Sequence, residues 1–258
     1  MEYRPDLTIS EDPDVYPPSE DSILLIESLD VRQGEKVLEV GCGSGVVSVH
    51  CAANGCDVTA GDVNPNAVML TRRNLEANGL EASVVETDVY SGIEGTFDTI
   101  VFNLPYLPVE EDGLLAKAWS GGPDGMGPLP KLLEGAPERL NEGGRIVVVV
   151  SSLMDQDALG RLLEGHKVRI LGEMSLFFEK LQVLEIRLRR FELRRSCSFG
   201  RFAIRRSCSF THCWLTSSTI TASCMRSVRR PHEGPSCRRR PDVRAGVHGV
   251  IHRLRRTN

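Results

Sequence analysis

Two short motifs, about sixty residues apart, contain residue types whose spacing could do chemistry. The first is a glycine-rich run over residues 39–45 (Glu-Val-Gly-Cys-Gly-Ser-Gly), and the second is the tetrapeptide Asn-Leu-Pro-Tyr at 103–106. The first can hold a nucleoside cofactor, and the second can hold a planar NH2 group beside it. Together they predict an enzyme that methylates a nitrogen atom with S-adenosylmethionine.

The glycine-rich run has the spacing G-x-G-x-G at Gly41, Gly43 and Gly45. Glycine adopts positive φ angles and lets the backbone approach a ligand closely, so this spacing predicts a sharp turn between a strand and a helix. Dinucleotide sites have the spacing G-x-G-x-x-G, with a pyrophosphate at the helix N-terminus. S-adenosylmethionine has no phosphate; its ammonium, sulfonium and ribose diol suit carboxylates such as Glu39.

Two further acidic residues follow predicted strands in phase with the glycine-rich run. Asp62 ends the second predicted strand, where a carboxylate can accept both ribose hydroxyls. Asp88 follows the third, where its side chain can reach the adenine amino group. Together with Glu39, they place three acids at successive strand ends, which favours a nucleoside cofactor over unrelated loop residues.

The tetrapeptide supplies what an amide or an exocyclic amine needs to act as a nucleophile. Such a nitrogen is a poor nucleophile because its lone pair is delocalised. The side-chain carbonyl of Asn103 and the backbone carbonyl of Leu104 can accept its two N–H bonds, while Tyr106 can stack on its plane. This fixes the nitrogen in line with the sulfonium methyl, so catalysis is mainly orientation and electrostatics.

The elements that must position these motifs alternate along the chain. The alternation predicts an α/β fold with a doubly wound, mostly parallel, Rossmann-like sheet that binds ligands at the carboxyl ends of its strands. The last two strands are expected to form a hairpin-like pair. The predicted strands are 37–40, 56–61, 82–86, 97–103, 145–151, 167–173 and 181–188, and the predicted helices are 22–29, 46–53, one starting at 64–65, 129–140 and 155–164.

These motifs resemble the class I methyltransferases of the HemK type, and within them the HemK2/Mtq2 branch of archaea and eukaryotes, over about residues 8–190. Residues 16–21 (Tyr-Pro-Pro-Ser-Glu-Asp) are similar to that branch's N-terminal motif, and residues 118–125 resemble its Ala-Trp-x-Gly-Gly-x-x-Gly loop. The resemblance implies seven strands with the last one antiparallel. The candidate cofactor-binding residues are Glu20, Asp21, Glu39, Gly41, Gly43, Gly45, Asp62, Asp88 and Asn103, and the candidate catalytic residues are Asn103, Leu104, Pro105 and Tyr106.

The resemblance also implies a substrate, which is the glutamine side-chain amide of the Gly-Gly-Gln loop in peptide-chain release factors. Some family members act on lysine, and many need a small zinc-containing activator of the Trm112 type. The family usually has Asn-Pro-Pro-Tyr, whereas this chain has Leu104 at the second position. Ribosomal RNA adenine dimethyltransferases share the form with leucine, so an RNA adenine is the alternative substrate. The Trp119 loop and the Glu20-Asp21 pair favour the release factor.

Charge divides the chain near residue 190. Residues 191–258 contain fifteen arginines, no lysine and three acids, a formal net charge of +12; residues 1–190 keep 16 basic and 32 acidic residues, a net charge of −16. We predict a methyltransferase domain over 1–190, followed by a disordered tail. The tail could be an arginine-rich nucleic-acid-binding arm, a Cys/His metal site or a non-native reading frame, and the last fits best. A nucleic-acid-binding protein that acts through this tail, with the methyltransferase core as a scaffold, is the second class of function.

The acidic domain is predicted to have little affinity for nucleic acid, and its charge suits high salt, as in a halophilic archaeon. No signal peptide is visible, and the longest apolar run, 146–150, is too short to cross a membrane. We therefore expect a cytoplasmic protein without a membrane partner, and we assign it no metal site.

Overall fold

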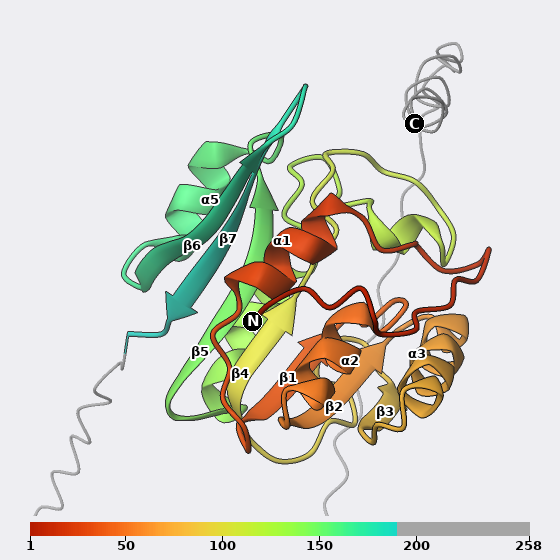
Figure 1. Cartoon of the computed structure of the whole chain (residues 1–258). Coiled ribbons are helices and arrows are strands. Elements are labelled where there is room, and N and C mark those ends of the chain that lie inside the picture. The colour runs from red at the N-terminus through yellow and green to blue at the C-terminus, as the bar shows by residue number, and fades with distance from the viewer. Residues whose placement is uncertain (190–258) are drawn as a thin grey trace, which may run out of the picture. The chain divides into compact units, whose positions relative to one another are not determined.

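A seven-stranded sheet runs through residues 1–189, which are the residues that the computed structural model describes (Figure 1). The strand order is β3-β2-β1-β4-β5-β7-β6, with β7 antiparallel to both neighbours and the other pairs parallel. The predicted doubly wound sheet and its final hairpin are confirmed. The strands are β1 (Lys36–Val40), β2 (Asp57–Asp62), β3 (Ser83–Glu86), β4 (Phe97–Phe102), β5 (Leu140–Ser151), β6 (Lys167–Ser175) and β7 (Lys180–Arg187).

Helices cover both faces of the sheet. Helices α1 (Glu20–Ser28), α2 (Val46–Ala53) and α3 (Pro65–Ala77) pack on one face, and α4 (Leu129–Gly135) and α5 (Gln156–Leu163) pack on the other. The apolar run in strand β5 explains how the sheet packs against helices on both faces. Side chains alternate between the two faces of a strand, so a continuous apolar run packs against both helix layers. Its residues Ile146, Val148 and Val150 join one buried cluster, and Val147 and Val149 join the other.

The segment between α4 and β5 differs from its prediction. The helix expected over 129–140 stops at Gly135, and a 3-10 turn, η2 (Ala136–Glu138), follows it. Pro137 has no N–H group to donate to the carbonyl four residues back, so the α-helical hydrogen bonds stop there, although Ala136 keeps helical backbone angles. Gly143-Gly144, expected to turn the chain into a strand at Arg145, instead lies inside β5, where the pairing with β4 shifts register.

The strand ends bring the motifs together. In the sheet register, Val40 of β1 lies opposite Gly61 of β2 on one side and Phe102 of β4 on the other. The residues that follow these partners are therefore neighbours at one edge of the sheet. The glycine-rich run, Asp62 and the tetrapeptide, which lie far apart in the sequence, meet at this edge, as predicted for the carboxyl ends of parallel strands.

None of the helices within residues 1–189 is long and apolar enough to span a membrane. The predictions made for the basic tail, which concern its disorder, its possible ligands and its reading frame, fall on residues 190–258 and so lie outside the described residues.

Candidate active site

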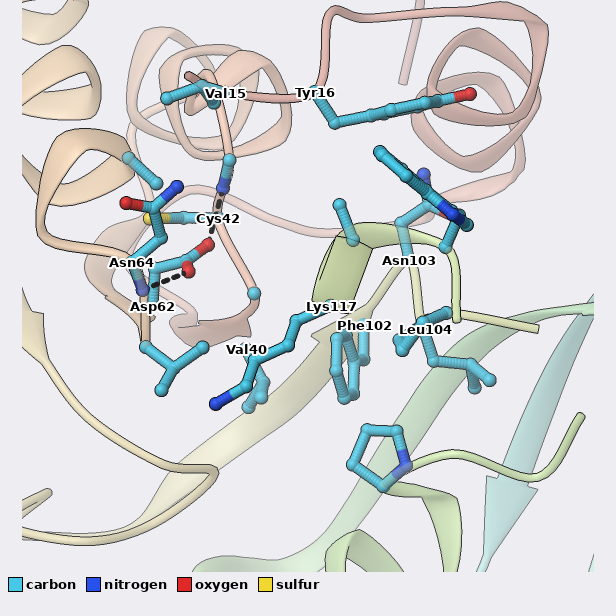
Figure 2. A pocket seen from close by; sticks show the side chains of 18 of the residues that line it. Val15, Tyr16, Val40, Cys42, Asp62, Asn64, Phe102, Asn103, Leu104 and Lys117 are labelled. Atoms are coloured by element: carbon cyan, nitrogen blue, oxygen red, sulfur yellow. Dashed lines mark hydrogen bonds between the residues drawn. The ribbon is translucent and has the colours of Figure 1, made fainter. Parts of the chain in front are cut away.

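A cavity of about 410 Å³ opens at this edge of the sheet, a volume typical of small-molecule sites (Figure 2). Two predicted site residues, Glu20 and Gly45, do not line this cavity. Glu20 is exposed at the start of α1, and Gly45 is the residue just before α2. The other predicted site residues all do; they are Asp21, Glu39, Gly41, Gly43, Asp62, Asp88, Asn103, Leu104, Pro105 and Tyr106.

The glycine-rich run needs glycine for two different reasons. Gly41, Gly43 and Gly45 all have positive φ angles, between 52° and 75°, which other residues rarely adopt. A Cβ atom on Gly41 would also lie 2.6 Å from the ring of Phe102 in β4, and one on Gly45 would lie 2.7 Å from the Thr71 side chain. Gly41 therefore lets β1 and β4 end side by side, while Gly45 allows α2 and α3 to pack.

Asp62 fixes the glycine-rich run in place. One carboxylate oxygen accepts the backbone N–H of Gly43 at 2.9 Å, and the other accepts that of Asn64 at 2.8 Å (Figure 2). Burial raises the pKa of Asp62, and these backbone hydrogen bonds oppose the rise. Since a carboxylate oxygen can accept more than one hydrogen bond, both oxygens remain available to a ligand in the cavity.

Glu39 is a buried carboxyl group that lines the cavity. It accepts a hydrogen bond from the Ser48 hydroxyl of α2, and burial raises its pKa to about 8. A bound cation beside this group would favour its ionised form, because opposite charges lower the pKa of a carboxyl. Asp88 is different: it is exposed at the rim and forms an ion pair with Lys131, with Nζ and Oδ2 2.6 Å apart.

The tetrapeptide after β4 holds a buried acceptor without a partner. Within residues 1–189, the Oδ1 atom of Asn103 is buried and no group donates a hydrogen bond to it. Leu104 is only 1% exposed, and its side chain packs into the core. The Tyr106 hydroxyl donates to Asp21 at 3.3 Å, which ties the tetrapeptide to the start of α1.

A second glycine-rich segment, residues 121–127, packs against the backbone of the tetrapeptide. Cβ atoms on Gly121 and Gly127 would each lie 2.7 Å from the backbone oxygen of Pro105, and one on Gly125 would lie 2.6 Å from that of Tyr106. Gly121 and Gly125 of the Ala-Trp-x-Gly-Gly-x-x-Gly loop, and Gly127 just after it, are thus required by close packing against the tetrapeptide. Their role in the site is to hold the shape of its backbone.

Tyr16, Trp119 and Lys117 are among the lining residues that were not assigned to the site from the sequence. The rings of Tyr16 and Trp119 both line the cavity, with centroids 6.3 Å apart, and the Trp119 indole donates to Glu111 at 3.0 Å. Lys117 extends into the cavity from η1 (Ala116–Ala118) (Figure 2). Tyr16 and Trp119 lie in the two segments that carry the family resemblance, residues 16–21 and 118–125. Their place in these segments could have identified them as site residues. Lys117 offered no such signal.

The sequence profile of the methyltransferase small domain family matches residues 6–173. The chain belongs to this family. The resemblance and the fold inferred from the motifs are confirmed, and the family supports S-adenosyl-L-methionine as the cofactor.

The chain is also similar to individual relatives. It is 38% identical over 179 residues to a Methanocaldococcus jannaschii protein named "putative protein N5-glutamine methyltransferase", a match covering 67% of this chain and 91% of that protein. It is 33% identical over 145 residues to ribosomal RNA small subunit methyltransferase C of Chromohalobacter salexigens, covering 53% of this chain but only 40% of that protein. The Mtq2–Trm112 complex of E. cuniculi, which methylates the termination factor eRF1, has the same fold, with a TM-score of 0.56 and 22% identity over 68% of this chain and 99% of that one.

Proposed function

We propose that this protein transfers a methyl group from S-adenosylmethionine to the side-chain amide nitrogen of the glutamine in the Gly-Gly-Gln loop of a peptide-chain release factor. The observation that carries the proposal is the unpartnered Oδ1 atom of Asn103, buried beside the glycine-rich run. A buried acceptor without a donor costs about 1–3 kcal/mol. The N–H group of a primary amide would satisfy it and would be held next to the methyl donor.

The residues around the glycine-rich run fit the proposed cofactor, which supplies a methyl group on a positively charged sulfur. Asp62 can accept the ribose hydroxyls while it keeps its two bonds to the backbone. Glu39 is a buried carboxyl group in the cavity lining, and we propose that it binds the ammonium of the methionine moiety. Asp88 forms an ion pair with Lys131 at the rim. We propose that its side chain turns away from Lys131 when it accepts a hydrogen bond from the adenine amino group.

The tetrapeptide then acts by positioning. The Asn103 side-chain carbonyl and the Leu104 backbone carbonyl accept the two amide N–H bonds, which orients the nitrogen lone pair towards the methyl donor. Tyr106 packs on the amide plane, and its hydrogen bond to Asp21 holds the ring in place. The nitrogen gains the methyl group as the carbon–sulfur bond breaks, and it releases one proton to water. Orientation of this kind therefore lowers the barrier without a dedicated acid or base.

An RNA base is the second candidate acceptor. Leu104 favours it, and so do the ribosomal RNA methyltransferases among the relatives. Two observations favour the protein substrate. The match to the M. jannaschii protein covers 91% of that relative, whereas the match to the RNA enzyme covers 40% of its length. The net charge of −16 over residues 1–190 also repels a phosphate backbone, which RNA binding normally has to neutralise.

The test separates the two acceptors. A form of the protein without residues 191–258 is incubated with labelled cofactor and either a release factor or ribosomal RNA, with and without a Trm112-type activator. We expect label on the release factor, and mass spectrometry should place it on the Gly-Gly-Gln glutamine. Label on a lysine would mean that the enzyme methylates lysine instead of glutamine. Label on RNA alone would mean that the substrate is an RNA base and would overturn the proposal. If the full chain transfers no methyl group but binds nucleic acid, and removal of the tail abolishes that binding, the second class of function is supported.

A further inference from the structure

Two phenylalanines project from the turn between β6 and β7. Phe177 is 92% exposed and Phe178 is 74% exposed, and their rings contact each other edge to face with centroids 4.6 Å apart. Exposure of two adjacent large aromatic side chains is unfavourable in water, since burial of each would contribute about 1.5–3 kcal/mol. Aromatic residues exposed in this way are typical anchors of protein interfaces.

The turn is held firmly, so the two rings have a defined place. Leu176 N donates to the Glu179 carbonyl at 2.7 Å and closes the turn. The Glu179 carboxylate accepts the Ser151 hydroxyl at 2.6 Å, and Ser152 and Lys180 exchange two further hydrogen bonds of 2.9 Å. These contacts anchor the hairpin tip to the carboxyl end of β5, on the edge of the sheet where the cavity opens.

The tip lies close to the candidate active site. Figure 1 shows the β6–β7 tip projecting from the same end of the sheet as the loop between β4 and α4, which carries Trp119. The pKa of Tyr106 is raised by burial first and by Asp21 next, and the negative charge of Glu179 adds to the rise. Residue 179 therefore lies within electrostatic range of the tetrapeptide, directly after the two phenylalanines.

We propose that Phe177 and Phe178 are a docking element for the protein substrate, and that they insert into an apolar hollow bordered by basic side chains. The proposal rests on the proposed function, and it names the surface that would bind the substrate outside the acceptor loop. The cavity can hold one acceptor side chain, so the rest of a protein substrate must rest on this edge of the sheet. The two rings are its most exposed apolar contact.

The charges near the cavity define the partner's chemistry. Glu110, Glu111 and Asp112, in the loop that follows the tetrapeptide, are all exposed. Lys180, next to the tip, is paired with Glu173 at 2.7 Å. A surface of this kind complements lysine and arginine side chains around an apolar hollow. Exposed aromatic rings can also stack on nucleic-acid bases, but binding of that kind relies on a positively charged groove.

The experiment uses the full chain and the double variant F177S/F178S. Because both side chains are exposed, the variant should fold normally, which a thermal melt verifies. We expect the KM for the release factor to rise at least tenfold, while kcat and the affinity for S-adenosylmethionine stay unchanged. The matched control is V168S/I170S, which removes two side chains of β6 that are 42% and 52% exposed and should leave all three quantities unchanged.

Other outcomes overturn the proposal in distinguishable ways. If F177S/F178S methylates the release factor with the KM of the wild type, the docking role is wrong while the proposed function stands. If the wild type methylates no release factor at all, the proposed function fails and the docking role falls with it. If the variant loses affinity for a labelled ribosomal RNA fragment and keeps its KM for the protein, the tip binds nucleic acid.

Discussion

Replacement of Asp62 by alanine tests the cofactor site most directly, because Asp62 has two roles in the structure. Its carboxylate faces the cavity, and it also accepts the N–H groups of Gly43 and Asn64. A hydrogen bond to a charged group contributes about 1.5–3 kcal/mol, so loss of the ribose contact should weaken cofactor binding about 10- to 150-fold. Loss of the two backbone contacts should also lower the free energy of unfolding, by about 1–3 kcal/mol.

Calorimetry of cofactor binding and denaturation of the free protein measure these two effects separately. Asp57→Ala is the matched control, since it removes an exposed carboxylate at the start of β2, at the opposite end of the strand from Asp62 and outside the cavity lining. A ribose-modified ligand sharpens the test. The wild type should bind S-adenosylhomocysteine more tightly than its 2′-deoxy analogue, and Asp62→Ala should lose this preference.

The reasoning would be refuted by an unchanged affinity for S-adenosylmethionine in Asp62→Ala. It would also be refuted if the variant bound the cofactor weakly but still preferred the ligand with the intact ribose. In that case the carboxylate acts on the cofactor only through the glycine-rich run, and the ribose is held by another group.

Three further predictions follow from the site. Asn103→Ala should lose most methyl transfer while its calorimetric affinity for the cofactor stays nearly intact, because the side chain positions the acceptor. Gly125→Ala should lower the melting temperature and the activity, because its Cβ atom would lie 2.6 Å from the Tyr106 backbone oxygen; Gly122→Ala, at a similar φ angle but with open space around it, is the control. The pKa of Glu39 is raised to about 8, so the stability of its neutral form is present below pH 4.5 and is lost as the pH rises through 8. Denaturation at pH 6 and pH 9 should show this loss in the wild type and a smaller one in Glu39→Gln.

The sequence was sufficient for the parts of the site that depend on single strands. Short buried strands in a parallel sheet end at a common edge, so the residues that follow β1, β2 and β4 could be placed together from their order alone. The start of α3 was equally readable, because Asn64 accepts the N–H of Asn66 and Pro65 occupies the first helical position. Each of these inferences depends on the few residues around one chain reversal.

The parts that could not be predicted depend on contacts between distant side chains. Tyr106 meets Asp21, and Tyr16 meets Trp119, across 85 and about 100 residues of sequence with no periodicity to connect them. The tie from Asp62 to Gly43 is of the same kind. The start of β5 was missed for another reason: a glycine pair reads as a turn, whereas Gly143 lies within β5, where a register shift is accommodated.

The position of Leu104 in the fold changes what this residue says about the substrate. In the sequence it is the departure that points to RNA. In the structure its side chain is 1% exposed and packs in the core cluster beneath the cavity, so a change between proline and leucine there alters core packing while the backbone carbonyl is kept. The tetrapeptide can therefore serve an amide or an exocyclic amine equally well. The choice between protein and RNA must then be made where a macromolecule would meet this edge of the sheet, at the acidic loop after β4 and at the exposed rings of Phe177 and Phe178.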